Sequence, residues 1–475
     1  MTGELLPLAI VLAAAGVLFS RNLHTATDYD EGVYLASLDA LRHGQQLGSE
    51  VFASQPPGFY LLLRLVAWPF GHSIVGIRTS FLIVALVACL AAYFLGRAVG
   101  GRWAGLGAAA LLAIAPPFPT EAPRVAADVP SVALAVAALA LAAYGFRRRG
   151  LVLPALAGAV FALAVFVKLL ALPALVPLAA LALWGRASLR QGTAVVIGAV
   201  VVAAAFAIGY AGVLGDLWRQ SVSFHHSARG FGGGEPNGHT VAHFLSFHTP
   251  FAWLVVLGVL AAIVAARRTW PLWLFAAGAA VFLLWQKPLF EHHLVLLAAA
   301  LAVPAGAGLG AAVVRFPNAL IGSGVLVAAI AAGYGQQVHR IDLQRTSEPA
   351  ELLWGARCLA AVTRPGELVA SDQPIVAFRA HRVLPGPLVD TSFVRLESGS
   401  LPPEQLLETV DHDRVPAVFA GRAFLREPKL LAGLRARYPR QLAYNGVRLF
   451  LAPRAGSRAA RAFGRGSCSD RPASR

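Results

Sequence analysis

Long apolar runs separated by short polar breaks fill the first 335 or so residues of the chain. A helix of roughly 17 to 22 apolar residues is long enough to cross the hydrocarbon core of a bilayer. The pattern therefore predicts a polytopic α-helical membrane protein with about 11 transmembrane helices, near residues 4–20, 74–96, 103–118, 129–146, 151–167, 169–184, 192–214, 250–266, 271–286, 294–314 and 319–335. A mean hydropathy of +0.64 with only 13% charged residues agrees with this class and excludes an ordinary soluble domain.

The charges between the runs predict how the chain is oriented. Arginines gather on alternate loops, at positions 97, 102, 147, 148, 149, 186, 190, 267, 268 and 315. Because cytoplasmic loops carry the excess of Lys and Arg, the N-terminus is expected in the cytoplasm and the segment after the last span outside it. Nearly all the acids of the loops then fall on the outer face.

The first outer loop, residues 21–73, opens with Asp28, Asp30 and Glu31. Residues 32–41 follow with an amphipathic pattern typical of a helix that lies on a membrane. Residues 58–70 are apolar but short, which predicts an interfacial or re-entrant helix. A carboxylate at this surface could take a proton from an acceptor hydroxyl, although an acid-rich solvated loop accounts for the same residues.

The composition changes after the last span. Helix-like segments (350–362, 403–410, 428–438) alternate with β-like runs (368–371, 375–379, 417–420, 447–452). We therefore expect a transmembrane module over 1–338, a small extracytoplasmic α/β domain over 339–453 and a disordered basic tail over 454–475. Asp372, Asp390 and Arg379 near strand ends could touch an acceptor or cap local structure.

The three cysteines form no recognisable pattern. Cys89 lies in a predicted span, and Cys358 and Cys468 are not spaced like a known motif. The sequence therefore predicts neither a disulfide framework nor a thiolate metal site.

Other polar residues stand at the outer ends of predicted spans. Asp128 begins one span, and a capping acid is the alternative explanation for it. Lys168 lies between two apolar runs, where an unpaired ammonium is costly unless it snorkels to the surface. Lys287, His292 and His293 form a further short outer loop.

The order of these features resembles the GT-C superfamily of polyprenyl-phosphate-sugar-dependent glycosyltransferases, in particular the group similar to protein O-mannosyltransferases and aminoarabinose transferases (glycosyltransferase family 39-like). The matching residues are Asp30-Glu31 after the first helix and Pro56-Pro57-Gly58-Phe59-Tyr60 in the same loop. The resemblance is best over the first 170 residues.

The resemblance implies a role for each matching residue. Asp30 is expected to be the catalytic base, with Glu31 beside it to tune or position it. Asp128, with Asp28 in support, would bind the acceptor or, together with Asp30, a divalent cation, and no other cofactor is expected. The donor phosphate is expected to contact Lys168, Arg124, Lys287, His292 and His293. Relatives often carry a lysine where this chain has Gln55, so a phosphate contact from that position is not expected to carry over.

The implied activity is transfer of a hexose or pentose from a polyprenyl-phosphate donor to a hydroxyl of a glycan, lipid or protein, with inversion. It would take place on the outer face of the plasma membrane. The formal charge of +16 lies on membrane-facing loops and the tail, so anionic lipids rather than nucleic acid are the expected partners. A transporter or flippase of a lipid-linked precursor and a non-catalytic membrane scaffold are the alternatives.

Overall fold

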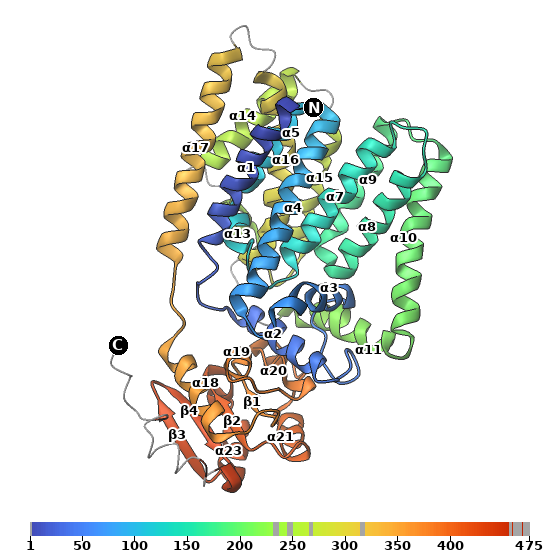
Figure 1. The fold of residues 1–475 in the computed structure, drawn as a ribbon. Coiled ribbons are helices and arrows are strands. Elements are labelled where there is room, and N and C mark those ends of the chain that lie inside the picture. The colour runs from blue at the N-terminus through green and yellow to red at the C-terminus, as the bar shows by residue number, and fades with distance from the viewer. Residues whose placement is uncertain are drawn as a thin grey trace.

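A bundle of apolar helices carries a small α/β domain at one end in the computed structural model, which describes residues 2–230, 237–244, 250–265, 269–313 and 319–455 together with 458 and 468 (Figure 1). The bundle helices are α1 (Thr2–Ser20), α4 (Ile74–Gly100), α5 (Arg102–Ala113), α7 (Asp128–Gly145), α8 (Val152–Val167), α9 (Leu175–Trp184), α10 (Leu189–Gly209), α14 (Pro250–Ala265), α15 (Trp270–Trp285), α16 (Val295–Val313) and α17 (Ala319–Gln344). Each predicted span overlaps one of these helices.

Five helices of the described residues are long and apolar enough to cross a membrane, namely Ile74–Gly100, Asp128–Gly145, Leu189–Gly209, Glu291–Val313 and Ile321–Gln344. Most of the other bundle helices are apolar but shorter. The interior is rich in alanine, for example Ala104, Ala108 and Ala305, which are all fully buried. Small side chains allow membrane helices to approach closely where lipid gives no hydrophobic driving force between them.

The loop over residues 21–73 folds into two helices, α2 (Tyr29–Arg42) and α3 (Pro57–Ala67) (Figure 1). They lie between the bundle and the C-terminal α/β domain, which is named the outer domain after its predicted location. The predicted interfacial helix corresponds to α3 and the turn η1 (Trp68–Phe70), where the Trp68 side chain is 82% exposed. Helix α2 differs from the expectation of a helix lying on the membrane, because residues 31–41 are all buried. It packs against α19 (Pro374–Arg379) of the outer domain, so both of its faces are covered.

The remaining connections are short. They comprise α6 (Phe118–Glu121), η2 (Leu169–Ala174), η3 (Ala211–Val213), α11 (Leu214–Trp218), the π-helical turn η4 (Arg219–Ser223), α12 (Phe224–Ser227), η5 (Ala228–Gly230), α13 (Asn237–Phe244) and η6 (Glu291–Leu294).

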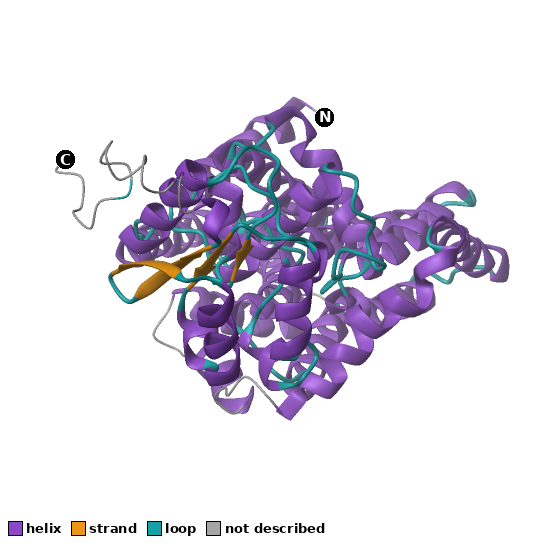
Figure 2. Cartoon of the chain, turned by 90° about the horizontal axis from the view of Figure 1, so that it is seen from below, coloured by secondary structure: helices purple, strands orange, loops and turns teal. Residues whose placement is uncertain are grey.

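The outer domain is a four-stranded sheet with short helices packed beside it, and Figure 2 shows it from the end of the molecule that carries this domain. Its strands β1 (Ala370–Ser371), β2 (Ala417–Ala420), β3 (Arg440–Tyr444) and β4 (Val447–Leu451) lie in the order β1-β2-β4-β3, with only β1 and β2 parallel. Its helices are α18 (Ala350–Val362), α19, η7 (Gly386–Leu388), α20 (Phe393–Glu397), α21 (Pro403–His412), α22 (Arg422–Arg426) and α23 (Pro428–Arg437). The predicted α/β fold of the C-terminal segment is confirmed, whereas its extracytoplasmic location stays a prediction.

One predicted strand is wrong and one strand was not predicted. Residues 375–379 form helix α19, because Pro374 occupies its first turn, where proline favours helix formation. Strand β3 was not predicted because it is an edge strand with a largely polar, exposed face. Most of the predicted disordered tail, 454–475, lies outside the described residues.

Candidate active site

The proline pair and glycine of the first loop bring that loop against the end of α8. Pro57 is the first residue of α3, a position that suits its fixed φ and missing N–H. A Cβ atom on Gly58 would lie 2.7 Å from the carbonyl oxygen of Phe166, so only glycine permits this approach. Because Phe166 precedes Lys168 by two residues, the Pro-Pro-Gly motif places the first loop beside that lysine.

Asp28 caps helix α2. Its Oδ1 accepts a hydrogen bond of 2.8 Å from the Glu31 N–H, and its Oδ2 accepts one of 2.8 Å from Arg124 Nη1. A carboxylate at this position satisfies one of the free N–H groups of the helix and complements its dipole. Both oxygens of Asp28 are therefore engaged, and the next helical turn is fixed.

Glu31 forms a buried ion pair with Arg78. Its two oxygens accept hydrogen bonds of 2.7 and 2.5 Å from Nε and Nη2 of Arg78, and Oε1 also accepts one of 3.2 Å from the Val125 N–H. The Glu31 side chain is only 1% exposed. Arg78 also donates to the carbonyls of Leu23 and Thr25, so this pair joins α2, α4 and the segment between α1 and α2. Glu31 is thus placed to hold Asp30 in position rather than to meet a substrate.

Asp30 differs from both neighbouring acids. Its side chain is exposed, and it forms no hydrogen bond or ion pair with the described part of the chain. Although the residue is accessible to solvent, the protein packed around it partly desolvates the carboxyl, and this raises the pKa of Asp30 to about 7. Asp28, Asp390 and Asp128 raise this pKa further, and Lys168 lowers it. Asp30 is therefore a free carboxyl close to four charged groups, with a pKa suited to proton transfer near neutral pH.

Asp128 and Lys168 form a second buried ion pair. Lys168 Nζ lies 2.8 Å from each oxygen of Asp128, which is the first residue of α7. Lys168 follows α8 in an extended conformation, where the helix breaks before η2. The pair explains how an ammonium is tolerated among apolar runs. It also shows that Lys168 does not simply snorkel away from the protein.

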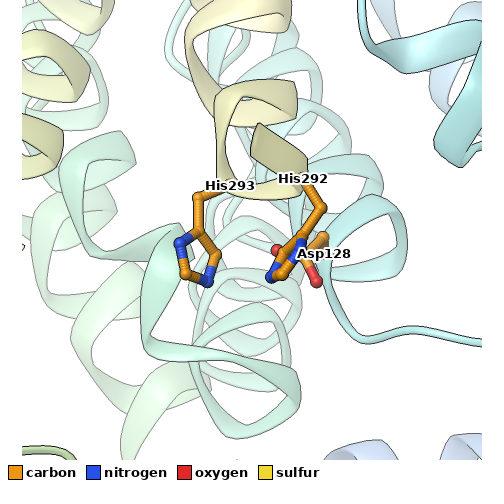
Figure 3. Close-up of side chains that lie close together, drawn as sticks. All are labelled: Asp128, His292 and His293. Atoms are coloured by element: carbon orange, nitrogen blue, oxygen red, sulfur yellow. The ribbon is translucent and has the colours of Figure 1, made fainter. Parts of the chain in front are cut away.

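His292 and His293 complete a cluster with Asp128 (Figure 3). One ligand-type atom from each of the three residues lies within 4.8 Å of the others. Both histidines come from η6, just before α16. The His293 Nδ1 accepts a hydrogen bond of 3.2 Å from the Phe290 N–H and also lies 3.1 Å from Gln286 Nε2, which favours the tautomer with its proton on Nε2. His292 forms no hydrogen bond with the described residues, although its ring contacts those of Phe290 and His293.

This cluster does not fit a divalent cation in the arrangement observed. Both oxygens of Asp128 face the ammonium of Lys168, which would repel a dication bound to the same carboxylate. His293 presents an N–H at Nε2 instead of a free lone pair, and a metal ligand needs the lone pair. The geometry suits an anion better than a cation.

We therefore expect removal of divalent cations to leave the activity unchanged. Initial rates of sugar transfer would be compared in reconstituted membranes before and after treatment with EDTA. Loss of activity with EDTA and its recovery with Mn²⁺ or Zn²⁺ would contradict this expectation and would restore the predicted cation site at Asp30 and Asp128.

The remaining predicted residues lie at different places. Arg124 pairs with Asp28 and, at 3.3 Å, with Glu121, whose pKa burial raises to about 8. Lys287 is exposed and forms no hydrogen bond or ion pair with the described residues. Gln55 is buried and donates to the Tyr34 hydroxyl at 3.1 Å, so it serves the packing of the loop.

The outer domain contributes a further acid to the site. Asp390 is buried, and its Oδ1 accepts a hydrogen bond of 3.3 Å from the Tyr29 hydroxyl. The Tyr29 hydroxyl in turn accepts one of 3.0 Å from the Thr391 N–H. Tyr29 precedes Asp30 on α2, and Asp390 raises the pKa of Asp30. The sequence suggested Asp390 only as a possible acceptor contact, because nothing in it joins residue 390 to residue 30.

Comparisons with known proteins agree with this architecture. A family model described as dolichyl-phosphate-mannose-protein mannosyltransferase matches residues 54–210, which include Gly58, Asp128 and Lys168 but not α2. No curated protein matches the sequence significantly.

Solved structures share the fold over most of the chain. ArnT from Cupriavidus metallidurans bound to undecaprenyl phosphate matches with a TM-score of 0.68 at 14% identity, over 94% of this chain and 97% of that chain. The archaeal oligosaccharyltransferase AglB from Archaeoglobus fulgidus, in complex with an inhibitory peptide and a dolichol-phosphate, matches with a TM-score of 0.53 at 13% identity, over 91% and 72%. The predicted membrane fold is thereby confirmed, because the chain shares the fold of ArnT and of AglB over more than nine-tenths of its length.

Proposed function

We propose that the protein transfers a sugar from a polyprenyl-phosphate donor to an acceptor hydroxyl at the outer face of the membrane, with inversion. The observation that carries this proposal is a free carboxyl, Asp30, beside the buried Asp128–Lys168 pair. The solved relatives hold undecaprenyl phosphate and a dolichol-phosphate, which supports a lipid phosphate as the carrier. The electrostatic coupling of Asp30 to this pair favours catalysis over a non-catalytic scaffold.

Asp30 would act as the general base. As the acceptor oxygen attacks the anomeric carbon, its proton moves to the Asp30 carboxylate and the bond from that carbon to the phosphate oxygen breaks. Attack opposite the phosphate inverts the anomeric configuration. The ion pair of Glu31 with Arg78 and the cap at Asp28 would hold Asp30 in place during this step.

Lys168 and the two histidines would stabilise the departing polyprenyl phosphate. Its leaving oxygen gains negative charge, which a preorganised ammonium and an N–H donor stabilise in a site of low dielectric constant. Lys168 is kept in place by Asp128, and His293 offers Nε2–H. Arg124, which pairs with Asp28, and exposed Lys287 are further candidates.

The pH dependence of the reaction follows from the raised pKa of Asp30. A general base must be ionised, so kcat/KM is expected to rise with pH through about 7, where Asp30 loses its proton. Replacing Asp390 by Asn removes a negative charge that raises this pKa, so the rising limb should move to lower pH. Asn keeps Oδ1, which accepts from Tyr29 and Ser392, so the contact between domains should remain.

An exposed acid of the same domain provides the matched control. Asp411 pairs with Arg437 at the surface, so Asp411→Asn should leave the pH profile unchanged. A profile of Asp390→Asn identical to that of the wild type would contradict the assignment of the titrating group to Asp30.

The proposal places the chain in the plasma membrane with a cytoplasmic N-terminus and an extracytoplasmic α/β domain. This orientation follows from the arginine-rich loops, and it brings Asp30, Asp390 and the lipid-phosphate cluster to one side. The acceptor would be a glycan, lipid or protein, and the sugar a hexose or pentose.

Reconstitution tests the function directly. Proteoliposomes containing the protein and a pool of polyprenyl-phosphate sugars would be given acceptor extracts from the cell envelope. We expect transfer with release of polyprenyl phosphate, no transfer from nucleotide sugars, and a product whose anomeric configuration is opposite to that of the donor. Movement of the intact lipid-linked sugar between leaflets without transfer would instead support a flippase.

A further inference from the structure

Two cysteines that are far apart in the sequence meet in the outer domain. Cys358 lies in α18, and Cys468 belongs to the C-terminal tail. Both side chains are almost fully buried in the same apolar cluster, and their thiols are hydrogen-bonded to each other. The third cysteine, Cys89, is buried in α4 of the bundle. The chain thus pairs its two cysteines outside the bundle.

Other residues of the tail also contact the outer domain. Arg458 Nη1 donates hydrogen bonds of 3.0 and 2.9 Å to the two carboxylate oxygens of Glu367. Ala455 is fully buried in the cluster that contains both cysteines. The thiol contact is therefore one of three points at which described residues of the tail lie on this domain.

We propose that Cys358 and Cys468 form a disulfide bond that fastens the C-terminal tail to the outer domain. The proposal rests on the extracytoplasmic location given under the proposed function, since disulfides persist in oxidising compartments and are rare in the cytosol. The pair does not fit a metal site, because the described part of the chain brings no third ligand to it.

The oxidation is an ordinary thiol–disulfide exchange. Each thiol loses one proton, a bond forms between the two sulfur atoms, and two electrons pass to the disulfide of an envelope thiol oxidase, which becomes a dithiol. The hydrogen bond with Cys358 lowers the pKa of the Cys468 thiol, which favours the thiolate that begins the exchange. The reaction would occur as the tail closes on the domain, before both sulfur atoms are buried.

The bond would stabilise the part of the domain that covers the candidate site. Helix α18 contacts α19, and α19 packs on α2, the helix that carries Asp30. Helix α18 also contacts the sheet, because its Trp354 ring stacks on the Tyr444 ring of β3, with the two ring centroids 5.4 Å apart. A tail fixed to Cys358 would therefore strengthen the element that links the last membrane helix to the sheet.

Counting free thiols tests the proposal. Membranes containing the full-length protein would be denatured in SDS with a maleimide polymer that adds a fixed mass to each free thiol. We expect one adduct, at Cys89, without reductant and three adducts after reduction. The variants Cys358→Ser and Cys468→Ser should each show two adducts without reductant, because each leaves a partner unpaired.

The other outcomes overturn the proposal. Three adducts on the unreduced wild type would show that the two thiols stay reduced, and a dimer on a non-reducing gel would show that they pair between chains. Neither result bears on Asp30, because transfer by the reconstituted protein is measured separately. A reduced pair in an active enzyme would reject the disulfide alone, and an oxidised pair in an inactive protein would reject the proposed function alone.

Discussion

The variant Asp30→Asn is expected to fold normally and to lose sugar transfer by roughly 10²- to 10⁴-fold, the usual contribution of a general base. The amide cannot accept the proton of the acceptor hydroxyl, yet it has nearly the same shape as the carboxyl. Folding should not suffer, because Asp30 is exposed and forms no hydrogen bond within the described residues. Removing this charge also removes its repulsion from Asp28 and Asp390. The measurement is the initial rate of transfer in proteoliposomes, normalised to folded protein.

The conservative variant Asp30→Glu helps to interpret this result. It keeps a base at the site but moves it by one methylene, so we expect activity between those of the wild type and Asp30→Asn. Near-normal transfer by Asp30→Asn would remove Asp30 from the mechanism, whatever the behaviour of the glutamate variant.

The variant Glu31→Gln, in contrast to Asp30→Asn, is expected to lose much of its stability. It leaves the Arg78 guanidinium charged, buried and without its anionic partner, and breaking such a pair costs about 3–5 kcal/mol. We expect a marked fall in the thermal midpoint in detergent and in the yield of monodisperse protein. The change in charge is the same as in Asp30→Asn, one residue away, so the two variants form a matched pair.

The two variants distinguish a residue that maintains the structure from one that takes part in the reaction. If Glu31→Gln folded like the wild type but transferred no sugar, Glu31 would act directly in the reaction, as the resemblance first implied. If both variants were unstable, the loss of activity in Asp30→Asn could not be assigned to proton transfer.

Hydropathy alone predicted the bundle, because a spanning helix needs little beyond length and apolarity. The secondary structure of the outer domain was harder to predict. Its short segments are buried on several sides, so apolar and polar residues do not alternate with a clear helical or strand period. Residues 375–379 look like a buried strand, yet they form a helix that packs on α2. Strand β3 could have been found from Asn445-Gly446, a two-residue hairpin turn in which both residues have positive φ.

The site was predicted as a set of residues but not as a set of contacts. Order and sidedness singled out Asp30, Asp128, Lys168 and the two histidines. They could not show that Asp128 is bound to Lys168, because that depends on how α7 and α8 pack. Arg78 was missed, although a lone arginine near the start of an apolar span is a signal for a buried partner. Nothing in the sequence around Cys358 or Cys468 predicts that these two residues are in contact.

The burial of α2 against the outer domain also bears on how the protein is made. A Cβ atom on Gly32 would lie 3.1 Å from the backbone nitrogen of Ile375, so the two helices touch backbone to backbone. At about 5 to 20 residues per second, the ribosome delivers Ile375 roughly 20 to 70 s after Gly32. Until then α2, the helix that carries Asp30, lacks the helix α19 that packs on it. A nascent or truncated chain would therefore enter the membrane with its candidate site incomplete, and under the proposed function it could transfer sugar only after the helix around Ile375 had been made and had packed on α2.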